Sequence, residues 1–498
     1  METLRKNPHI YEINLMTWLH DLNRKEGYEV NLRNIPPREW RRLKDVGMDL
    51  IWLMGIWQRS PHSIKEARGE PSLVQECRTI FDDFEIADIA GSPYAVHDYV
   101  PDPTFGSEED LKALKKQMEG EGLFLILDFV PNHTACDHHW IKTHPEYYIL
   151  DKPKESSGCS EGFFLADSMK GKVCIAHGKD PYFPPWTDTA QINYARPETL
   201  RAMTELLTRL ATYCHGLRCD MAMLPLKEVF RESWGRYLRE EWNAEEFWAL
   251  TIDCLRSKGI PFLLLAEAYW GKEKDLLNLG FHCAYDKHLY DLMVEGDIQG
   301  LRNHLLAPVA NQAKMVRFLE NHDEPRAIKA FGPDRIKCAM VIHSTLPGMR
   351  FWQHGQFEGN RIRVPVQVRR APKEIIDDDL KDFTVRLLNE VNHPALHEGG
   401  WEICSTQGWP DNPSHQNLLA WCWRKGEYRR LVVMNFSTSP AQGYVRLPTN
   451  WLHEGEQFLL SDPLKGENFL RSAKETDQSG LYVGLDKHDF HFFRVEKG

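Results

Sequence analysis

The sequence lacks three features that would each indicate a large class of proteins. None of its apolar runs approaches the ~20 residues that a transmembrane helix needs, and its polar first residues contain no apolar signal-peptide region. Its net charge is −11, with acidic and basic residues interspersed, whereas a surface that binds nucleic acid is usually basic. We therefore expect neither a membrane nor a nucleic acid among its partners.

Paired cysteine spacing is also absent. The 11 cysteines are scattered along the chain, and several, including Cys219 and Cys254, lie in apolar runs where they are typical of small buried hydrophobes. An odd, dispersed set fits a reducing compartment better than a disulfide framework. The sequence thus predicts a cytoplasmic protein, and it contains no internal repeat or low-complexity tract.

Short apolar runs alternate with longer amphipathic stretches through the first three-quarters of the 498 residues. Repeated strand–helix alternation predicts a parallel sheet. Eight such strands would close into a (β/α)8 TIM barrel, an α/β fold whose size suits this part of the chain. The runs are 10–19, 50–57, 123–130, 217–223, 262–269, 283–285, 316–319 and 349–352.

Two stretches depart from this alternation besides residues 61–92, which we expect to be a loop after the second strand. Residues 134–195 are rich in His, Pro, Gly and aromatic residues with little periodicity, and an idle loop of that length is uncommon. From about residue 395, short strand-like runs are split by Gly, Pro, Asn and Asp, which is typical of an all-β domain. We expect a barrel at 1–133 and 196–393, an inserted subdomain at 134–195 after the third strand, and a C-terminal β-sandwich at 394–498.

Polar residues follow four of the predicted strands. In a parallel barrel, such residues at the carboxyl ends of strands indicate a catalytic site. Arg218 and Asp220 alternate along one strand, so both can face the same cavity. Each residue taken singly also fits a structural role, but four such strand ends in order favour a site. Its members would be Asp128, Asn132, His133, Arg218, Asp220, Glu267, His322 and Asp323.

Carboxylates on either side of a cleft are what cleavage of a glycosidic bond requires. One attacks the sugar or activates water, and the other protonates the leaving oxygen. The apolar run before Glu267 would raise the pKa of that acid by desolvation, and Arg218 would keep Asp220 ionised. The pattern therefore predicts a glycoside-cleaving enzyme.

At these positions the chain resembles the α-amylase family of glycoside hydrolases. Segment 92–99, with Phe105 and Gly106, resembles the family segment before the third strand, and Gln191–Asn193 resembles a fifth motif. The four main motifs are Asp128-Phe-Val-Pro-Asn-His133, Gly216-Leu-Arg-Cys-Asp220, Ala266-Glu267-Ala268 and Phe318-Leu-Glu-Asn-His-Asp323.

The resemblance implies a retaining enzyme that acts on α-glucosidic bonds, with a role for each residue. Asp220 would be the nucleophile, Glu267 the acid and base, and Asp323 the residue that binds and distorts the sugar. The sugar and the nucleophile would be held by His133, His322 and Arg218, with Tyr94 stacked on the sugar face. Asp128 and Asn132 would support the loop that carries His133.

The chain departs from the family pattern at three positions. Met223 and Leu224 stand where many α-amylases have Lys and His, and Gln191 stands where an aspartate is frequent. The resemblance would place a calcium shell on Asn132, Gln191 and Leu224. Calcium prefers six to eight oxygen ligands with carboxylates among them. We therefore expect no metal and no other cofactor.

Three alternatives remain open from the residues. A transglycosylase would use the same intermediate and pass it to a sugar hydroxyl. A catalytically inactive relative would serve as a binding or partner protein, although the three carboxylates argue against it. A metal hydrolase would use the cluster His133, Cys136, Asp137, His138 and His139, whose spacing matches no standard zinc pattern.

Overall fold

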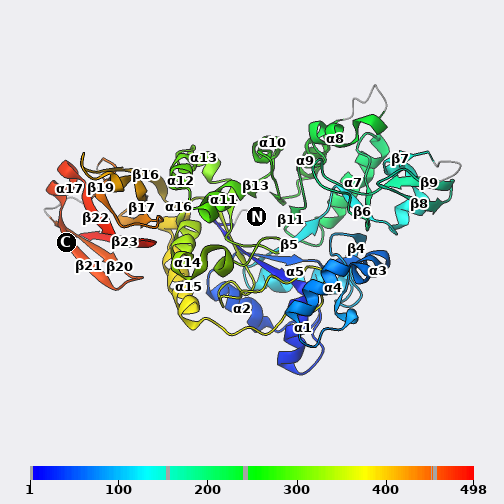
Figure 1. The fold of residues 1–498 in the computed structure, drawn as a ribbon, viewed down its shortest axis with the longest axis horizontal. Helices are drawn as coiled ribbons and strands as arrows, with labels where there is room; N and C mark the ends of the chain where they lie inside the picture. The colour runs from blue at the N-terminus through cyan, green and yellow to red at the C-terminus, as the bar shows by residue number, and fades with distance from the viewer. Residues whose placement is uncertain (1–3, 153–157, 239–244, 450, 453–456, 498) are drawn as a thin grey trace.

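The computed structural model describes residues 4–152, 158–238, 245–449, 451–452 and 457–497. Eight parallel strands close into a barrel, which confirms the predicted TIM-barrel fold (Figure 1). In order around the barrel they are β1 (His9–Asn14), β15 (Met349–Gln353), β14 (Met315–Arg317), β13 (Cys283–Tyr285), β12 (Leu263–Ala266), β11 (Gly216–Cys219), β5 (Phe124–Phe129) and β2 (Leu50–Met54).

Amphipathic helices cover the barrel between these strands. In α7, for example, Leu200, Met203, Leu207 and Leu210 recur at helical spacing and are all buried. The helices are α1 (Leu15–Glu26), α2 (Pro37–Asp45), α3 (Pro61–Gly69), α4 (Pro71–Ile80), α5 (Glu108–Gly120), α7 (Pro197–Leu210), α8 (Lys227–Trp234), α9 (Phe247–Ser257), α10 (Glu273–Leu279), α11 (Lys287–Glu295), α12 (Ile298–Leu305), α13 (Val309–Gln312), α14 (Ala327–Thr345) and α15 (Asp378–Val391).

The segment after β5 forms a small β-rich unit at the opposite end of the molecule from the C-terminal strands (Figure 1). Its strands β6 and β10 pair antiparallel, and β7, β9 and β8 form a three-stranded sheet. The elements are β6 (His133–Ala135), α6 (His139–Thr143), β7 (Leu150–Asp151), β8 (Phe163–Ser168), β9 (Gly171–Ala176) and β10 (Thr189–Gln191). Between β2 and β5, the antiparallel strands β3 (Trp57–Arg59) and β4 (Val96–Pro101) form a further pair.

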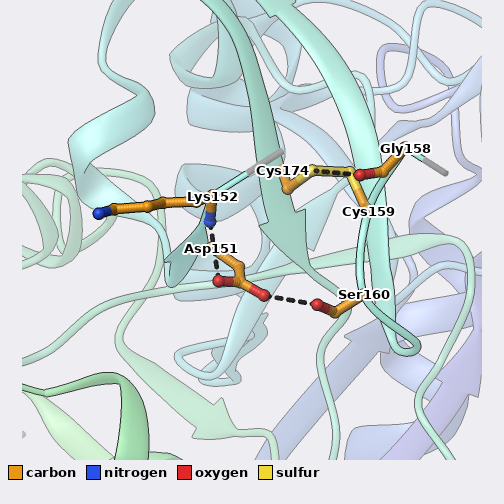
Figure 2. Close-up of a disulfide and its surroundings, with 6 residues drawn as sticks. All are labelled: Asp151, Lys152, Gly158, Cys159, Ser160 and Cys174. Atoms are coloured by element: carbon orange, nitrogen blue, oxygen red, sulfur yellow. Dashed lines mark hydrogen bonds between the residues drawn. A yellow bond between two sulfur atoms is a disulfide. The ribbon is translucent and has the colours of Figure 1, made fainter. Parts of the chain in front are cut away.

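One disulfide joins Cys159 to Cys174 in this unit (Figure 2). Cys174 lies on β9, and Cys159 precedes β8, so the bond ties the entrance of the hairpin to its second strand. Ser160 beside it donates to Asp151 at 2.7 Å. The cysteine pattern did not predict this pair, because its spacing of 15 residues becomes a contact only through the hairpin. The expectation that the cysteines are unpaired is therefore wrong for Cys159 and Cys174, and the cytoplasmic setting stays an untested prediction.

The C-terminal strands form one eight-stranded antiparallel sheet in the order β21-β20-β23-β18-β17-β16-β19-β22. The strand β16 pairs with β17 along Gly400–Cys404 and with β19 along Ser405–Gln407. Strands that change partners in this way make the corners of packed β-sheets. The single sheet therefore folds around its own core. The sequence predicted a β-sandwich for this part of the chain. The strands are β16 (Gly400–Gln407), β17 (Leu418–Lys425), β18 (Tyr428–Asn435), β19 (Ala441–Arg446), β20 (Gln457–Asp462), β21 (Glu467–Ser472), β22 (Leu481–Leu485) and β23 (Asp489–Lys497).

This sheet rests on the barrel through α14 and α15. The indole N–H of Trp423 donates to the carbonyl of Thr345 at 2.7 Å, and the indole of Trp421 donates to the Thr345 hydroxyl at 3.2 Å. Among the described residues, no helix combines the length and the apolar character needed to cross a membrane. The division at residues 133, 195 and 393 stays our proposal for the domain boundaries.

Candidate active site

The predicted site residues lie at the carboxyl ends of neighbouring barrel strands. Asp128 is the last residue but one of β5, Arg218 lies on β11, and Glu267 directly follows β12. Strands β5, β11 and β12 are adjacent, with Arg218 level with Asp128 in the register. Because parallel strands end at the same edge of a barrel, their polar side chains converge there.

Arg218 is the centre of this group. Its side chain is 1% exposed, and its Nη1 lies 2.7 Å from Asp220 Oδ1 and 3.5 Å from Asp128 Oδ1. Its Nη2 lies 2.7 Å from Glu267 Oε2. Burial would lower the pKa of Arg218, but the charges of Glu267 and the other neighbours raise it well above its usual value. One guanidinium therefore joins Asp220 and Glu267 through two different nitrogens.

Aromatic rings surround the same guanidinium. Its central carbon lies 5.0 Å from the ring centre of Trp52, 5.4 Å from that of Tyr94 and 5.9 Å from that of Tyr285. Such contacts between a cation and an aromatic face stabilise the charge where water is excluded. They also fix the guanidinium plane, so that both nitrogens keep their carboxylate partners.

Glu267 is held from two sides besides Arg218. Its Oε2 accepts a hydrogen bond from the Met221 amide at 2.7 Å, and its Oε1 accepts one from the Tyr269 hydroxyl at 2.9 Å. Met221 has φ of 41°, a left-handed conformation that is rare for a residue with a side chain. This strained backbone, directly after Asp220, aims its N–H at Glu267.

Burial governs the protonation of both carboxyl groups. Desolvation raises the pKa of Glu267 to about 7, and Asp220 and Asp323 add to the rise while Arg218 opposes it. Desolvation also raises the pKa of Asp220, and the charge and hydrogen bond of Arg218 oppose it. The sequence led us to expect that Arg218 would keep Asp220 ionised. That expectation is incomplete, because Asp220 is only 7% exposed and desolvation is the larger effect.

A second network of charged side chains, centred on His322, lies beside the network centred on Arg218. His322 Nδ1 lies 2.5 Å from Glu12 Oε1, and its Nε2 lies 3.1 Å from Asp323 Oδ2 and 2.8 Å from the Tyr94 hydroxyl. Burial would lower the pKa of His322, but Asp323 and Glu12 raise it well above its usual value. Desolvation would raise the pKa of Asp323, and His322 lowers it to about 2. His322 therefore lies between two carboxylates that favour its protonated form.

The predicted support residues make specific contacts. Asp128 Oδ2 accepts from the indole of Trp52 at 3.0 Å and from the Gly55 amide at 3.4 Å, and burial raises its pKa to about 6. Asn132 lies 3.3 Å from His133 through its side-chain nitrogen. Burial lowers the pKa of His133 to about 4, so its ring is neutral at pH 7.

Sequence reasoning missed Glu12, Tyr269 and the amide of Met221. Glu12 is a single acidic residue in the apolar strand β1, and its partner His322 is 310 residues away in the chain. Tyr269 gave a usable signal, because it follows Glu267 by two residues beyond a strand end. The left-handed conformation of Met221 had no signal in the sequence.

The residues expected at the family's calcium position do not suit a cation. Gln191 Nε2 donates to Asn132 Oδ1 at 3.0 Å, to the Asn132 carbonyl at 3.0 Å and to the Ile192 carbonyl at 3.1 Å. The side-chain NH2 group of Gln191 thus points at three oxygens, in the place that a cation bound to those oxygens would occupy. Leu224 is buried, at 3% exposure, and offers no side-chain oxygen.

The alternative metal cluster does not converge as a set. Cys136 Sγ lies against the Thr189 carbonyl, and Asp137 accepts from the amide of His62 and pairs with His97. Two of its five members, His138 and His139, lie near Asp98 closely enough to share a metal ion. His138 Nδ1 accepts the Trp140 amide, so the neutral ring carries its hydrogen on the other nitrogen. That tautomer does not suit a metal ligand.

Comparisons with known proteins agree with the barrel fold. Residues 40–274 match the family model of the alpha-amylase catalytic domain. An alpha-glucosidase of Culex pipiens is 25% identical over 306 residues, which is 53% of this chain and 52% of that protein. The maltogenic alpha-amylase of Thermotoga neapolitana has a TM-score of 0.68 at 16% identity, with 99% of both chains covered. The isomaltulose synthase of Erwinia rhapontici, solved with sucrose, has a TM-score of 0.65 at 15% identity, again with 99% of both chains covered.

The closed eight-stranded barrel places the chain in the class of (β/α)8 proteins, the fold of these solved structures. Residues 40–274, just under half of the chain, resemble the alpha-amylase catalytic domain. It spans about half the length of the curated relatives that it matches.

Proposed function

We propose that this chain is a retaining glycosidase that acts on α-glucosidic bonds through a covalent glycosyl-aspartate intermediate. The observation that carries the proposal is the Arg218 bridge, which holds Asp220 and Glu267 at 2.7 Å from two nitrogens of one guanidinium. A retaining mechanism needs two carboxyl groups close together, at about 5–5.5 Å. A rigid guanidinium fork between them supports that spacing.

Asp220 is the proposed nucleophile. One carboxylate oxygen attacks the anomeric carbon, while Glu267 gives its proton to the departing glycosidic oxygen. Glu267 suits that role because its pKa of about 7 lets it hold a proton near neutral pH. It then removes a proton from the incoming water or sugar hydroxyl, which releases the sugar from Asp220.

Binding of the sugar at the cleaved bond falls to Asp323, His322, Tyr94 and His133. Asp323 stays ionised, with a pKa of about 2, and its side chain is 53% exposed, so its oxygens are free to accept from sugar hydroxyls. Tyr94 stacks against His322 at 5.4 Å and presents an aromatic wall. His133 is buried and neutral, which suits a hydrogen bond to a sugar hydroxyl without charge.

The proposed substrate is a carbohydrate, an α-glucan or an α-glucoside. Transfer to a sugar hydroxyl is the alternative fate of the same intermediate, and the isomaltulose synthase neighbour shares the fold. A partner protein without activity has no need for the buried, strained arrangement of Met221, Asp220 and Glu267. Such strain persists where function requires it.

The test is a product analysis with the purified protein on maltooligosaccharides, trehalose, sucrose and isomaltose, with and without an added sugar acceptor. We expect turnover of at least one substrate, and the acceptor separates hydrolysis from transfer. The matched control is Asp253→Asn, because Asp253 is a carboxyl group 75% exposed on α9. No turnover on any α-glucoside would refute the proposed function.

A further inference from the structure

Two long segments rise from the barrel strands on either side of β1. The α3–α4 segment (residues 61–90) follows β2 and β3, and the β15 connection (residues 354–377) follows β15. Both β2 and β15 are hydrogen-bonded neighbours of β1. In Figure 1 the yellow β15 connection crosses to the blue helices, and the two segments meet through an antiparallel bridge between Ile89 and Val368.

An apolar cluster holds the two segments together. Val368 of the β15 connection is fully buried against Leu73, Cys77, Phe81 and Ile89 of the α3–α4 segment. Main-chain hydrogen bonds continue the contact, from the Ala90 amide to the Gln367 carbonyl at 2.6 Å and from the Arg369 amide to the Asp88 carbonyl at 2.9 Å. Apolar burial and backbone pairing together make this a packed wall.

Ion pairs fasten the wall at its outer side. Arg370 binds Asp88 at 2.8 Å and Asp83 at 2.9 Å, and its guanidinium lies 4.6 Å from the ring centre of Phe81. Arg363 binds Glu76 at 3.1 Å. The guanidinium of Arg370 uses two nitrogens on Asp88, the two-point geometry that makes such pairs strong.

A small cavity lies between His322 and the β15 connection. The cavity behind His322 measures about 100 Å³, and it is lined by Asn14, Gln353, Arg363 and Glu374 among others. A cavity of roughly 150 Å³ holds one benzene molecule. A pyranose ring with its hydroxyl groups is bulkier than benzene, so this cavity does not hold a second sugar.

The wall stands on the side away from the leaving group. Strand β12, which carries Glu267 at its end, lies opposite β1 in the barrel order. Glu267 protonates the leaving oxygen under the proposed function, so the leaving part of the substrate departs on the β12 side. The other end of the donor sugar then points toward β1 and meets the wall.

We propose that this wall limits the donor side to one terminal sugar, so that the enzyme removes single glucosyl units from chain ends and does not cut within a chain. This inference rests on the proposed function. It predicts that groups added to the terminal 4- and 6-hydroxyls collide with the wall.

The test compares two substrates, 4-nitrophenyl α-maltoheptaoside with a free terminal glucose and the same compound with a 4,6-ethylidene group on that glucose. We expect glucose as the first released sugar from the free compound, and cleavage of the blocked compound to be slower by roughly a hundredfold or more. Equal rates on both compounds would overturn the wall proposal and leave the proposed function intact. Absence of turnover on both compounds and on all four sugars of the panel would overturn the proposed function, and this inference with it.

A pair of variants tests the wall itself. Arg370→Ala removes its two ion pairs, and we expect the rate on the blocked compound to rise about tenfold relative to the free one. The control is Lys337→Ala, which removes an exposed ion pair with Asp379 between α14 and α15, where neither residue belongs to the apolar cluster of the wall. An unchanged ratio in a folded Arg370→Ala protein would contradict the proposal, and the wild-type comparison stands even if that variant does not fold.

Discussion

Two buried arginines at opposite ends of the barrel differ in what surrounds them. Arg218, at the carboxyl end of β11, has Asp128, Asp220 and Glu267 within ion-pair distance. Arg350, near the amino end of β15, donates to the Leu396 carbonyl at 2.7 Å and lies 3.3 Å from His9 Nε2. Each of the two arginine residues, taken with its main chain, is 0% exposed.

The pKa values of the two arginines therefore shift in opposite directions. Burial lowers the pKa of Arg350 to about 9, and among the described residues it has no ion pair with a carboxylate. The neighbouring carboxylates of Arg218 overcome the same burial and raise its pKa well above the usual value. Burial of a charge is thus a weak sign of function, whereas several carboxylates around one cation at the carboxyl edge of the barrel indicate a site.

The largest expected effect comes from the two carboxyl groups at the centre of the comparison. Asp220→Asn and Glu267→Gln should each lower kcat/KM by several powers of ten, because removal of one member of a catalytic unit has effects of that size. Steady-state kinetics on the best substrate of the panel provide the measurement, with Asp253→Asn as the control. Turnover near the wild-type level in a folded Asp220→Asn protein would sink the assignment of the nucleophile.

The arginines themselves give the next largest effect. Arg218→Met leaves three buried carboxylates without their cation, so we expect kcat/KM to fall about a hundredfold or more and stability to fall by about 3–5 kcal/mol. Arg350→Met removes a buried charge that has no carboxylate partner, so kcat/KM should stay within about twofold. Urea unfolding and steady-state kinetics on both variants measure the difference between the two arginines. Equal losses of kcat/KM in the two variants would contradict it.

The strand ends could be read from the sequence because each carries a local signal, an apolar run that stops at a carboxylate. The barrel, Asp220, Glu267 and Asp323 follow from that signal. Glu12 could not be found in this way, since its role depends on His322, which the fold brings from 310 residues away. The turn of β16 between two partners and the Cys159–Cys174 bond depend likewise on tertiary contacts.

The pH dependence gives a smaller effect. Activity requires protonated Glu267, so kcat/KM should fall as pH rises through about 7. The pKa of Glu267 is higher in the folded protein than in the unfolded chain, so its contribution to stability is present at low pH and is lost as pH rises from about 4.5 to 7.

A variant at Glu12 on β1 tests the His322 network separately from the Arg218 network. Glu12→Gln lowers the pKa of His322, so we expect kcat/KM to decrease roughly tenfold above neutrality, about 1.4 kcal/mol, with less loss at low pH. Glu12→Asp should restore part of the activity. A uniform loss across all pH values would show that Glu12 serves structure alone.

For calcium, we expect no effect on the melting temperature. Gln191 presents N–H groups to the oxygens of Asn132 and Ile192, so added calcium or chelator should leave the melting temperature unchanged. A bound ion would raise it by mass action. Gln191→Glu replaces those N–H groups with a charge, and we expect calcium to stabilise this variant relative to wild type. A calcium-dependent rise in the wild-type protein would show that the interpretation of these positions is wrong.

The central claim is that Asp220 forms a covalent bond to the sugar, and the configuration of the first product tests it most directly. Two successive displacements at the anomeric carbon retain its configuration, whereas a single displacement by water inverts it. Proton NMR recorded in the first minutes of hydrolysis distinguishes the two anomers before they equilibrate. The account predicts an initial α-anomer, and an initial β-anomer would contradict it.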